Sequence, residues 1–526
     1  MKKFLLLTLA FLLTVGLAVA QQNNSNVNQN GDKNVGNNTQ IGKKNDAGID
    51  QDGDNNSSDN HQRGDENWLN TFQDGDWNTS NTNQNGDKNT ANTEQRGDEN
   101  ESLTNQDGDR NDSNVDQRGR ENGAYTDQDG DRNNSNTVQR GRENNAETDQ
   151  YGNDNFSQTY QDGRENSSAV DQDGDRNAAW TDQYGRDNAS WLKQDGDRNL
   201  GSVYQDGVNN HSDAHQDGDD NDIYVTQLWE NNRSWAKQDG DKNLGSVYQD
   251  GNYNRSNLDQ DGDRNTGYIT QFGNGNQSDA KQEGDKNVAQ VDQFGNRNSS
   301  DLNQDGDDND IYVSQLWEEN DSWAKQDGDH NSATVNQNGY KNNSHLLQDG
   351  DHNSASVQQY GVRNDSDLKQ DGDKNDASIN QSGERNRSNA LQDGDDNTLY
   401  VSQIFDDNSS WAKQDGDKNQ GDVNQFGFEN TSDLTQDGDR NNADIDQVGA
   451  KNSAWSLQDG DQNILMTNQD GIENTANTEQ DGDYNFSNTV QFGYDNYGNT
   501  YQEGDKHTSN INQVGAHNVS NVIQKD

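Results

Sequence analysis

The chain has no cysteine and no proline among its 526 residues, and only 24% of its residues are apolar. Without cysteine there is neither a disulfide framework nor a thiol site, so stability must come from the fold itself. An average protein of this length would contain about 26 prolines. Proline suits linkers and disordered tails but cannot donate a backbone N–H to a β-ladder, so its absence indicates β-structure along most of the chain.

Positive charge is also scarce, with 40 Lys and Arg against 96 Asp and Glu and a net charge of −56. Low hydrophobicity with high net charge is typical of disorder, so the chain can fold only if its few apolar residues are concentrated at core positions. No basic patch could contact phosphates, which argues against nucleic acid as a partner. No Ser/His/Asp set or phosphate loop is present and the carboxylates recur in columns, so we predict that the protein is not an enzyme.

The first 20 residues have the features of a secretory signal peptide. Two lysines precede an apolar run that starts at Phe4, and residues 18–20 (Ala-Val-Ala) form a small-residue cleavage site. A transmembrane anchor is the alternative, but the run is short and uncharged amide-rich sequence follows it instead of a positive flank. We therefore predict a signal peptide over 1–20, a short N-terminal segment over 21–28, and a secreted chain without membrane contact after cleavage.

An eleven-residue repeat runs through the rest of the chain without an insertion or a deletion. Gln recurs at position 29 and at every eleventh residue up to Gln524, 46 times in all. Five residues after Gln comes Asn, with one exception inside the repeats. Two residues after Gln comes Gly, except where the chain stops and at Trp229, Trp317 and Phe405.

The repeat predicts one strand and one turn per unit. With Gln as position 1, positions 6, 8, 10 and the next Gln alternate with more variable residues, which is the period of a strand with one inward face. Positions 2 to 5, such as residues 173–176 (Asp-Gly-Asp-Arg), indicate a turn in which Gly adopts a positive φ. Because one short strand cannot bury a face, the units must fold back and stack about 4.8 Å apart. We predict an all-β fold, a β-solenoid over residues 29–526.

Two kinds of unit alternate, which predicts coils of two strands and 22 residues. From Gln172 to Gln502 every second turn is QDGD or QEGD, whereas the turns between them vary and are often aromatic. Position 10 is β-branched after the acidic turns, as at Val203, but Leu or Ala after the others, as at Leu192. The coil would have one acidic edge, one partly aromatic edge, and two unlike strands whose side-chain volumes compensate across the core.

The amide residues are the predicted assembly site. Stacking would place each Gln and Asn over its equivalent in the next coil, where side-chain amides can hydrogen-bond in ladders along the axis. Ladders and strand edges left open at a terminal coil can continue into another copy. The predicted assembly residues are Gln172, Asn177, Gln183, Asn188, Gln194, Asn199, Gln205, Asn210, Gln216 and Asn221, and the predicted turn glycines are Gly174, Gly185, Gly196 and Gly207.

The acidic turns oppose stacking, since two unit charges about 4.8 Å apart in water repel by roughly 0.9 kcal/mol. Lys or Arg at position 5 would offset part of this repulsion. Residues 195–199 resemble the first half of a calcium loop, but the later Gly and bidentate Glu are missing. The acidic edge is therefore either a solvated surface that aids solubility or a row of weak, non-specific sites for a divalent cation such as calcium. The candidate ligands are Asp173, Asp175, Asp195 and Asp197; we expect no other cofactor.

Aromatic residues recur at outward position 9 in every fourth coil. They could join neighbouring fibres or stack on sugars, or they could pair across strands and stiffen the sheet. The candidates for such a lateral contact are Tyr224, Trp235, Tyr312, Trp323, Tyr400 and Trp411.

The recurring pattern Q-x-G-x-x-N-x-A-x-x-x-Q, as in residues 282–293 (QEGDKNVAQVDQ), resembles the curlin repeat of bacterial curli fibre subunits. The resemblance covers nearly the whole chain after the predicted signal peptide. It implies an extracellular functional amyloid of the biofilm matrix, a homopolymer exported through an outer-membrane secretion pore and started by a surface nucleator. The chain departs from familiar curlins in its many repeats, its acidity and its serines, which leaves open whether it is the main subunit, a nucleator or a surface relative.

Two functions follow from these observations. The first is a curli-like structural protein at the cell surface that forms fibres by templated β-strand addition. The alternative is a monomeric cell-surface solenoid that binds calcium, sugar or ice, although ice binding needs a more regular outward array than this one. Fibres with cross-β diffraction would favour the first function, and a stable monomer at high concentration would favour the second.

Overall fold

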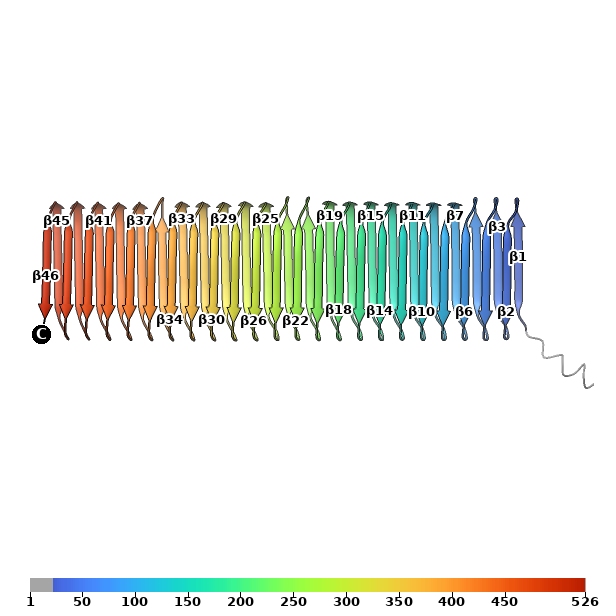
Figure 1. Cartoon of the computed structure of the whole chain (residues 1–526), viewed down its shortest axis with the longest axis horizontal. Helices are drawn as coiled ribbons and strands as arrows, with labels where there is room; N and C mark the ends of the chain where they lie inside the picture. The colour runs from blue at the N-terminus through green and yellow to red at the C-terminus, as the bar shows by residue number, and fades with distance from the viewer. Residues whose placement is uncertain (1–21, 526) are drawn as a thin grey trace, which may run out of the picture. The chain divides into compact units, whose positions relative to one another are not determined.

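A computed structural model describes residues 22–525, so the predicted signal peptide lies outside the described residues. Those residues contain 46 strands and no helix (Figure 1). They fall into two compact units, divided after Lys242.

Each strand covers the inward positions of one sequence repeat and part of the turn that follows. The strands of unit 1 are β1 (Asn24–Asn30), β2 (Val35–Ile41), β3 (Asp46–Asp52), β4 (Ser57–Arg63), β5 (Trp68–Asp74), β6 (Thr79–Asn85), β7 (Thr90–Asp98), β8 (Glu101–Asp107), β9 (Asp112–Arg120), β10 (Gly123–Asp129), β11 (Asn134–Arg142), β12 (Asn145–Tyr151), β13 (Phe156–Arg164), β14 (Ser167–Asp173), β15 (Ala178–Arg186), β16 (Ala189–Asp195), β17 (Leu200–Val208), β18 (His211–Asp217), β19 (Asp222–Glu230) and β20 (Arg233–Asp239).

Unit 2 continues the same alternation of strand and turn. Its strands are β21 (Leu244–Asp250), β22 (Arg255–Asp261), β23 (Thr266–Phe272), β24 (Gln277–Glu283), β25 (Val288–Asn296), β26 (Ser299–Asp305), β27 (Asp310–Glu318), β28 (Asp321–Asp327), β29 (Ser332–Tyr340), β30 (Asn343–Asp349), β31 (Ser354–Val362), β32 (Asp365–Asp371), β33 (Asp376–Glu384), β34 (Arg387–Asp393), β35 (Thr398–Ile404), β36 (Ser409–Asp415), β37 (Gln420–Phe428), β38 (Thr431–Asp437), β39 (Asn442–Ala450), β40 (Ser453–Asp459), β41 (Ile464–Ile472), β42 (Thr475–Asp481), β43 (Phe486–Tyr494), β44 (Tyr497–Glu503), β45 (Thr508–Ala516) and β46 (Val519–Lys525).

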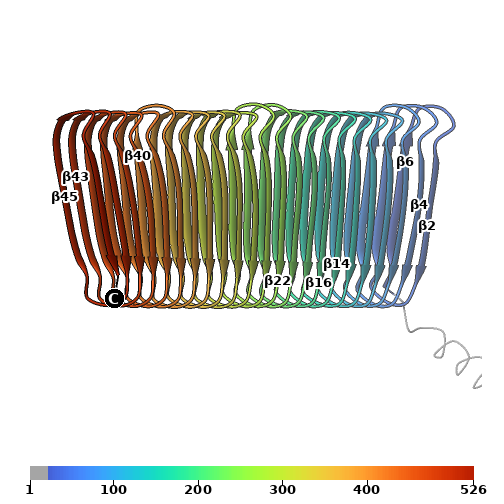
Figure 2. The same ribbon diagram turned by 60° about the vertical axis from the view of Figure 1, so that its left-hand side comes forward.

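Within each unit the odd-numbered strands form one parallel sheet and the even-numbered strands form the other (Figures 1 and 2). Hydrogen-bonded partners are always 22 residues apart, so Gln161 pairs with Gln183 in one sheet and Gln172 with Gln194 in the other. The prediction of a β-solenoid with two strands and 22 residues per coil is confirmed.

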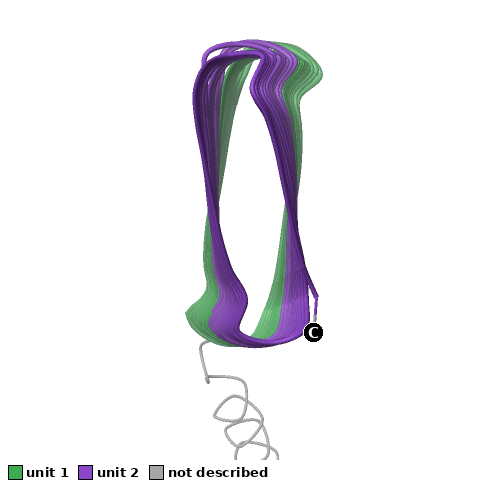
Figure 3. Cartoon of the chain, turned by 90° about the vertical axis from the view of Figure 1, so that its left-hand side faces the viewer, with its two compact units in different colours: residues 1–242 green, residues 243–526 purple. Residues whose placement is uncertain are grey.

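The two sheets of a unit face each other across a narrow core (Figure 3). Residues alternate between buried and exposed along each strand, and Leu192 and Val203 are both fully buried. A Cβ added at Gly201 of β17 would lie 2.5 Å from Leu192 Cδ1 of β16, so glycine at position 8 makes room for leucine on the opposite strand. Side-chain volumes therefore compensate across the core, as the sequence predicts.

Each turn contains two left-handed residues, of which the sequence indicated only the glycine. Gly174 has φ +119°, and a Cβ there would collide with the carbonyl oxygen of Gly196 in the next coil. Two residues later Arg176 has φ 63°, and the non-glycine residues at this position 5 have φ between 52° and 64° throughout the described turns. Such values are uncommon for residues with a side chain. The reversal of the chain within four residues accounts for both.

Candidate assembly site

The constant eleven-residue spacing of Gln produces continuous hydrogen-bonded columns inside each unit. Gln172 Nε2 donates to Gln194 Oε1 (2.8 Å), and Gln194 Nε2 donates in turn to Gln216 Oε1 (2.9 Å). In the facing sheet Gln183 Nε2 donates to Gln205 Oε1 (2.8 Å). All of these side chains are fully buried. Every one of these bonds runs from one coil to the next in the same direction, so each column has a donor end and an acceptor end.

The Gln side chains also tie the two sheets together. Gln172 Nε2 donates a second hydrogen bond to the backbone carbonyl of Phe156 (3.0 Å), the first residue of β13 in the opposite sheet. Gln183 makes the equivalent bond to the carbonyl of Ser167 (2.8 Å) at the start of β14. A buried amide with both its N–H groups and its carbonyl engaged escapes the cost of burying an unpaired polar group. The repeat therefore uses Gln as a cross-link between three strands.

The Asn residues join coils in a different way. On the acidic edge Asn177 Nδ2 donates to the carbonyl of Gly196 (2.7 Å), and Asn177 Oδ1 accepts the backbone N–H of Asn199 (2.9 Å). These bonds are made to the backbone of the next coil, whereas we expected amide-to-amide ladders. On the other edge Asn188 Nδ2 also reaches Asn166 Oδ1 (3.2 Å). Like Asn177, Asn210 and Asn221 donate through Nδ2 to backbone carbonyls of the next coil, those of Trp229 and Gly240.

The second Asp of the acidic turn has a structural role that the sequence analysis missed. Asp197 Oδ1 accepts the backbone N–H of Asp175 in the preceding coil (2.8 Å), and Asp219 Oδ1 accepts that of Asp197 (2.8 Å). Only a short acceptor side chain can reach this N–H. The recurrence of Asp at position 4, beside a variable position 5, was the sequence feature that could have indicated this role. Where position 4 is not Asp or Asn the strand often extends further, as in β15, which ends at Arg186.

Some of the acidic side chains form ion pairs along the surface. Lys193 Nζ lies 2.6 Å from Asp195, and Arg198 Nε lies 2.6 Å from Asp220 in the next coil. Part of the predicted repulsion is thus offset by cations from position 5 and from position 11. Nowhere within residues 22–525 do three or more His, Asp or Glu side chains gather as they would around a metal ion, and this includes the candidate ligands Asp173 and Asp175.

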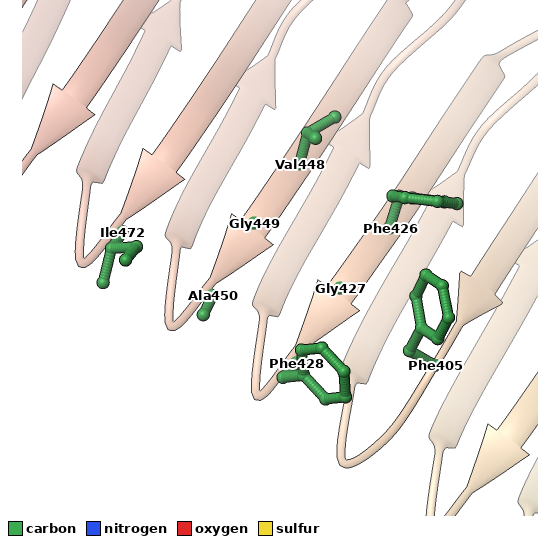
Figure 4. Close-up of a pocket in the computed structure, with 8 residues that line it drawn as sticks. All are labelled: Phe405, Phe426, Gly427, Phe428, Val448, Gly449, Ala450 and Ile472. Atoms are coloured by element: carbon green, nitrogen blue, oxygen red, sulfur yellow. The ribbon is translucent and has the colours of Figure 1, made fainter.

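The second edge carries a shallow apolar groove in unit 2 (Figure 4). Its floor is the glycine column at Gly427 and Gly449, and its walls are side chains from positions 2 and 4 of successive turns together with Phe405 from position 3. The cavity measures about 310 Å³ and is lined by Phe405, Phe426, Phe428, Val448, Ala450 and Ile472 as well as the two glycines. Phe405 replaces the turn glycine and has φ 75°, which is lower than the φ of the neighbouring glycines.

The six outward aromatics do not share one face. Tyr224, Tyr312 and Tyr400 lie on odd-numbered strands, whereas Trp235, Trp323 and Trp411 lie on even-numbered strands of the other sheet. Trp235 and Trp411 are exposed, but the ring of His345 stacks on Trp323 at 4.2 Å. Lateral contacts through the tyrosines and through the tryptophans would therefore use different sheets, and both stay predictions.

The first coil of unit 1 and the last coil of unit 2 expose residues that are buried elsewhere. All seven residues of β1 are exposed, and the inward positions of β46 are only partly covered. Gln29 is exposed, whereas Gln51 in the next coil is fully buried. Gln524 Nε2 donates to the carbonyl of Thr508 across the core (3.0 Å). The inward positions of β1 and β46 are therefore less covered than those of the strands next to them.

Comparison with known proteins relates the repeats to one family. The family model described as the curlin associated repeat matches residues 86–119, 196–228, 235–262, 256–284, 262–295, 284–316, 328–361 and 372–404. None of the curated proteins compared with the chain is significantly similar to it. No helix with the length and apolarity to cross a membrane occurs in the described part of the chain.

Proposed function

The chain belongs to the curlin-repeat family, and on that premise we propose that it is a secreted, non-catalytic fibre subunit of an extracellular matrix. Curlin repeats and a β-solenoid fold fit a curli-like structural protein. In the proposed mechanism the exposed terminal coil of one copy templates the docking of another copy. Export through an outer-membrane pore and nucleation at the cell surface are part of the same proposal.

The polarity of the Gln columns carries this proposal. Every observed bond runs from Nε2 of one coil to Oε1 of the next, as from Gln491 to Gln513 at the end of unit 2. Addition of the β1–β2 coil of a second copy to the β45–β46 coil of the first would continue both columns. Gln513 would donate to Gln29 of the second copy, and Gln524 would donate to Gln40. The join would reproduce the 22-residue register without a new kind of contact.

A pair of adjacent substitutions tests this proposal. Val522 is an inward, partly covered residue of β46, whereas Ile523 points outward and is 61% exposed. The V522D variant would place a charge on the docking surface and should stop elongation, because a carboxylate buried without a partner is costly. The I523D control adds the same charge outside that surface and should still form fibres. Electron microscopy and fibre diffraction of the full chain provide the readout.

Two outcomes would overturn the proposal. Equal fibre growth by V522D and I523D would show that the last coil is not the docking surface. A wild-type chain that stays monomeric at high concentration, under all ionic conditions, would favour the alternative of a monomeric binding module.

A further inference from the structure

Two arrays of the same composition face outward on the even-numbered strands, one in each unit. In each array two tryptophans lie two coils apart, and an aspartate on the strand between them is in register with both. Array 1 consists of Trp191, Asp213 and Trp235 on β16, β18 and β20, and array 2 consists of Trp411, Asp433 and Trp455 on β36, β38 and β40.

The indoles of both arrays are accessible. Trp191 and Trp235 are 54% and 57% exposed, and Trp411 and Trp455 are each 39% exposed. Large aromatic side chains left in solvent at matched positions mark a surface that a ligand can cover. The aspartate between the indoles is half-buried in each array. Desolvation raises the pKa of Asp433 above its usual value, which is consistent with its position between two rings.

The spacing of the arrays selects the class of ligand. Two coils span about 10 Å at the usual separation of strands, which is close to the disaccharide repeat of an extended β-1,4-linked polysaccharide. In such a chain alternate sugar rings present equivalent faces. One ring could stack on each indole, and a hydroxyl of the ring between them could donate to the aspartate.

Array 1 also borders a polar cavity formed by β18, β20 and the turn before β18. Asn209, His211 and Arg233 line a space of about 290 Å³, and His211 and Arg233 are register partners on β18 and β20. His211 and Arg233 stand two residues before Asp213 and Trp235 on their strands. These side chains offer hydrogen-bond donors for sugar hydroxyls beside the stacking surface. Stacking could also recruit a nucleic acid, but a chain with a net charge of −56 would repel its phosphates.

We propose that each array binds an uncharged β-1,4-linked polysaccharide lying across the strands, with the indoles as stacking platforms and the aspartate as a hydroxyl acceptor. The arrays face away from the core and from the strand edges that would join copies. Binding to polysaccharide therefore does not depend on the proposed polymerisation, and either property can fail without the other.

Trp323 supplies a matched control. It occupies the same position 9 on β28 and lies in the same S-W-A-K-Q-D-G run as Trp235. Its register partners are Asp301 and His345, and the ring of His345 covers one face of its indole. Two coils beyond Trp323, where an array has its second tryptophan, the residue is Asp367. Loss of Trp323 removes an outward indole from the same sheet without removing an array.

Calorimetric titration of the full chain with cellohexaose tests the proposal. We expect two sites per chain in the wild type, one in W191A/W235A, one in W411A/W455A, and none in the fourfold variant. W323A should keep both sites. Circular dichroism of each variant checks that the solenoid is intact, and D213N with D433N should weaken binding severalfold while keeping the stoichiometry.

Three results would overturn the proposal. The first is unchanged binding when both arrays are removed, and the second is an equal loss in W323A. The third is concentration-dependent self-association that disappears in the array variants while cellohexaose binds to none of the proteins, because the arrays would then be contacts between copies of the chain.

Discussion

The Gln columns predict a large and local loss of stability when one amide is removed. Gln337 on β29 is fully buried and makes three hydrogen bonds through its side chain. Its Nε2 donates to Gln359 Oε1 (2.9 Å) and to the carbonyl of Asp321 (2.7 Å), and its Oε1 accepts from Gln315 Nε2 (2.9 Å). In Q337M the side chain keeps a similar length but loses all three bonds.

The magnitude follows from the lost bonds and the groups left behind. Each hydrogen bond contributes roughly 1 kcal/mol net, and a buried polar group left without its partner costs about 1–3 kcal/mol. Allowing for the apolar contacts that Met regains, we expect Q337M to destabilise its coil by about 3–5 kcal/mol. N336M is the control, because Asn336 is the adjacent outward residue and is only half-buried.

Amide hydrogen exchange measures this loss where it occurs. In a solenoid each coil contacts mainly its neighbours, so the loss should be concentrated in the strands next to the substitution. We expect protection in β27, β29 and β31 to fall by at least two orders of magnitude in Q337M and to stay within a few-fold of wild type in N336M. Equal protection in the two variants would show that the Gln columns do not stabilise the coils.

Three other predictions concern the turns and the surface charge. G174A should lower stability by at least about 2 kcal/mol, because φ is +119° and a Cβ would meet the Gly196 carbonyl. In thermal unfolding G275A should cost less than half as much, because φ is +68° and the added Cβ would make only an ordinary contact, 3.5 Å from Arg297 Cγ. Burial and the neighbouring carboxylates raise the pKa of Asp149 to about 6, above the unfolded value near 3.9. The folded chain therefore takes up a proton that the unfolded chain does not as pH falls from about 6 to about 4, so stability should rise over this range. D149N should stabilise the chain by about 1 kcal/mol at pH 7, after a discount for solvent screening, and should flatten this pH dependence. Finally, the rate of fibre growth should increase with added salt because the acidic edges are then screened, and a rate indifferent to both salt and acid would contradict the charge argument.

The arrangement of coils could be predicted because it depends on period alone. A fixed Gln every eleven residues, inward alternation and two kinds of turn allow only one simple way to bury every Gln and every position 8 and 10. The pairing of Gln161 with Gln183 therefore follows from counting. The parallel register and the unlike facing strands follow for the same reason, since a slip of one residue would turn the outward face, with its charged side chains, inward.

What each polar group bonds to was decided only by the tertiary structure. The sequence indicated that Gln172 and Asn177 would stack, but not that Gln172 reaches the opposite sheet or that Asn177 binds the backbone of the next coil. From the sequence, Asp197 was interpreted only as a negative charge and a candidate cation ligand. In the folded turn its carboxylate accepts a backbone N–H. Repetition along one dimension determines which residues lie above one another, but the turn geometry, with its second left-handed residue, determines how far and in which direction each side chain can reach.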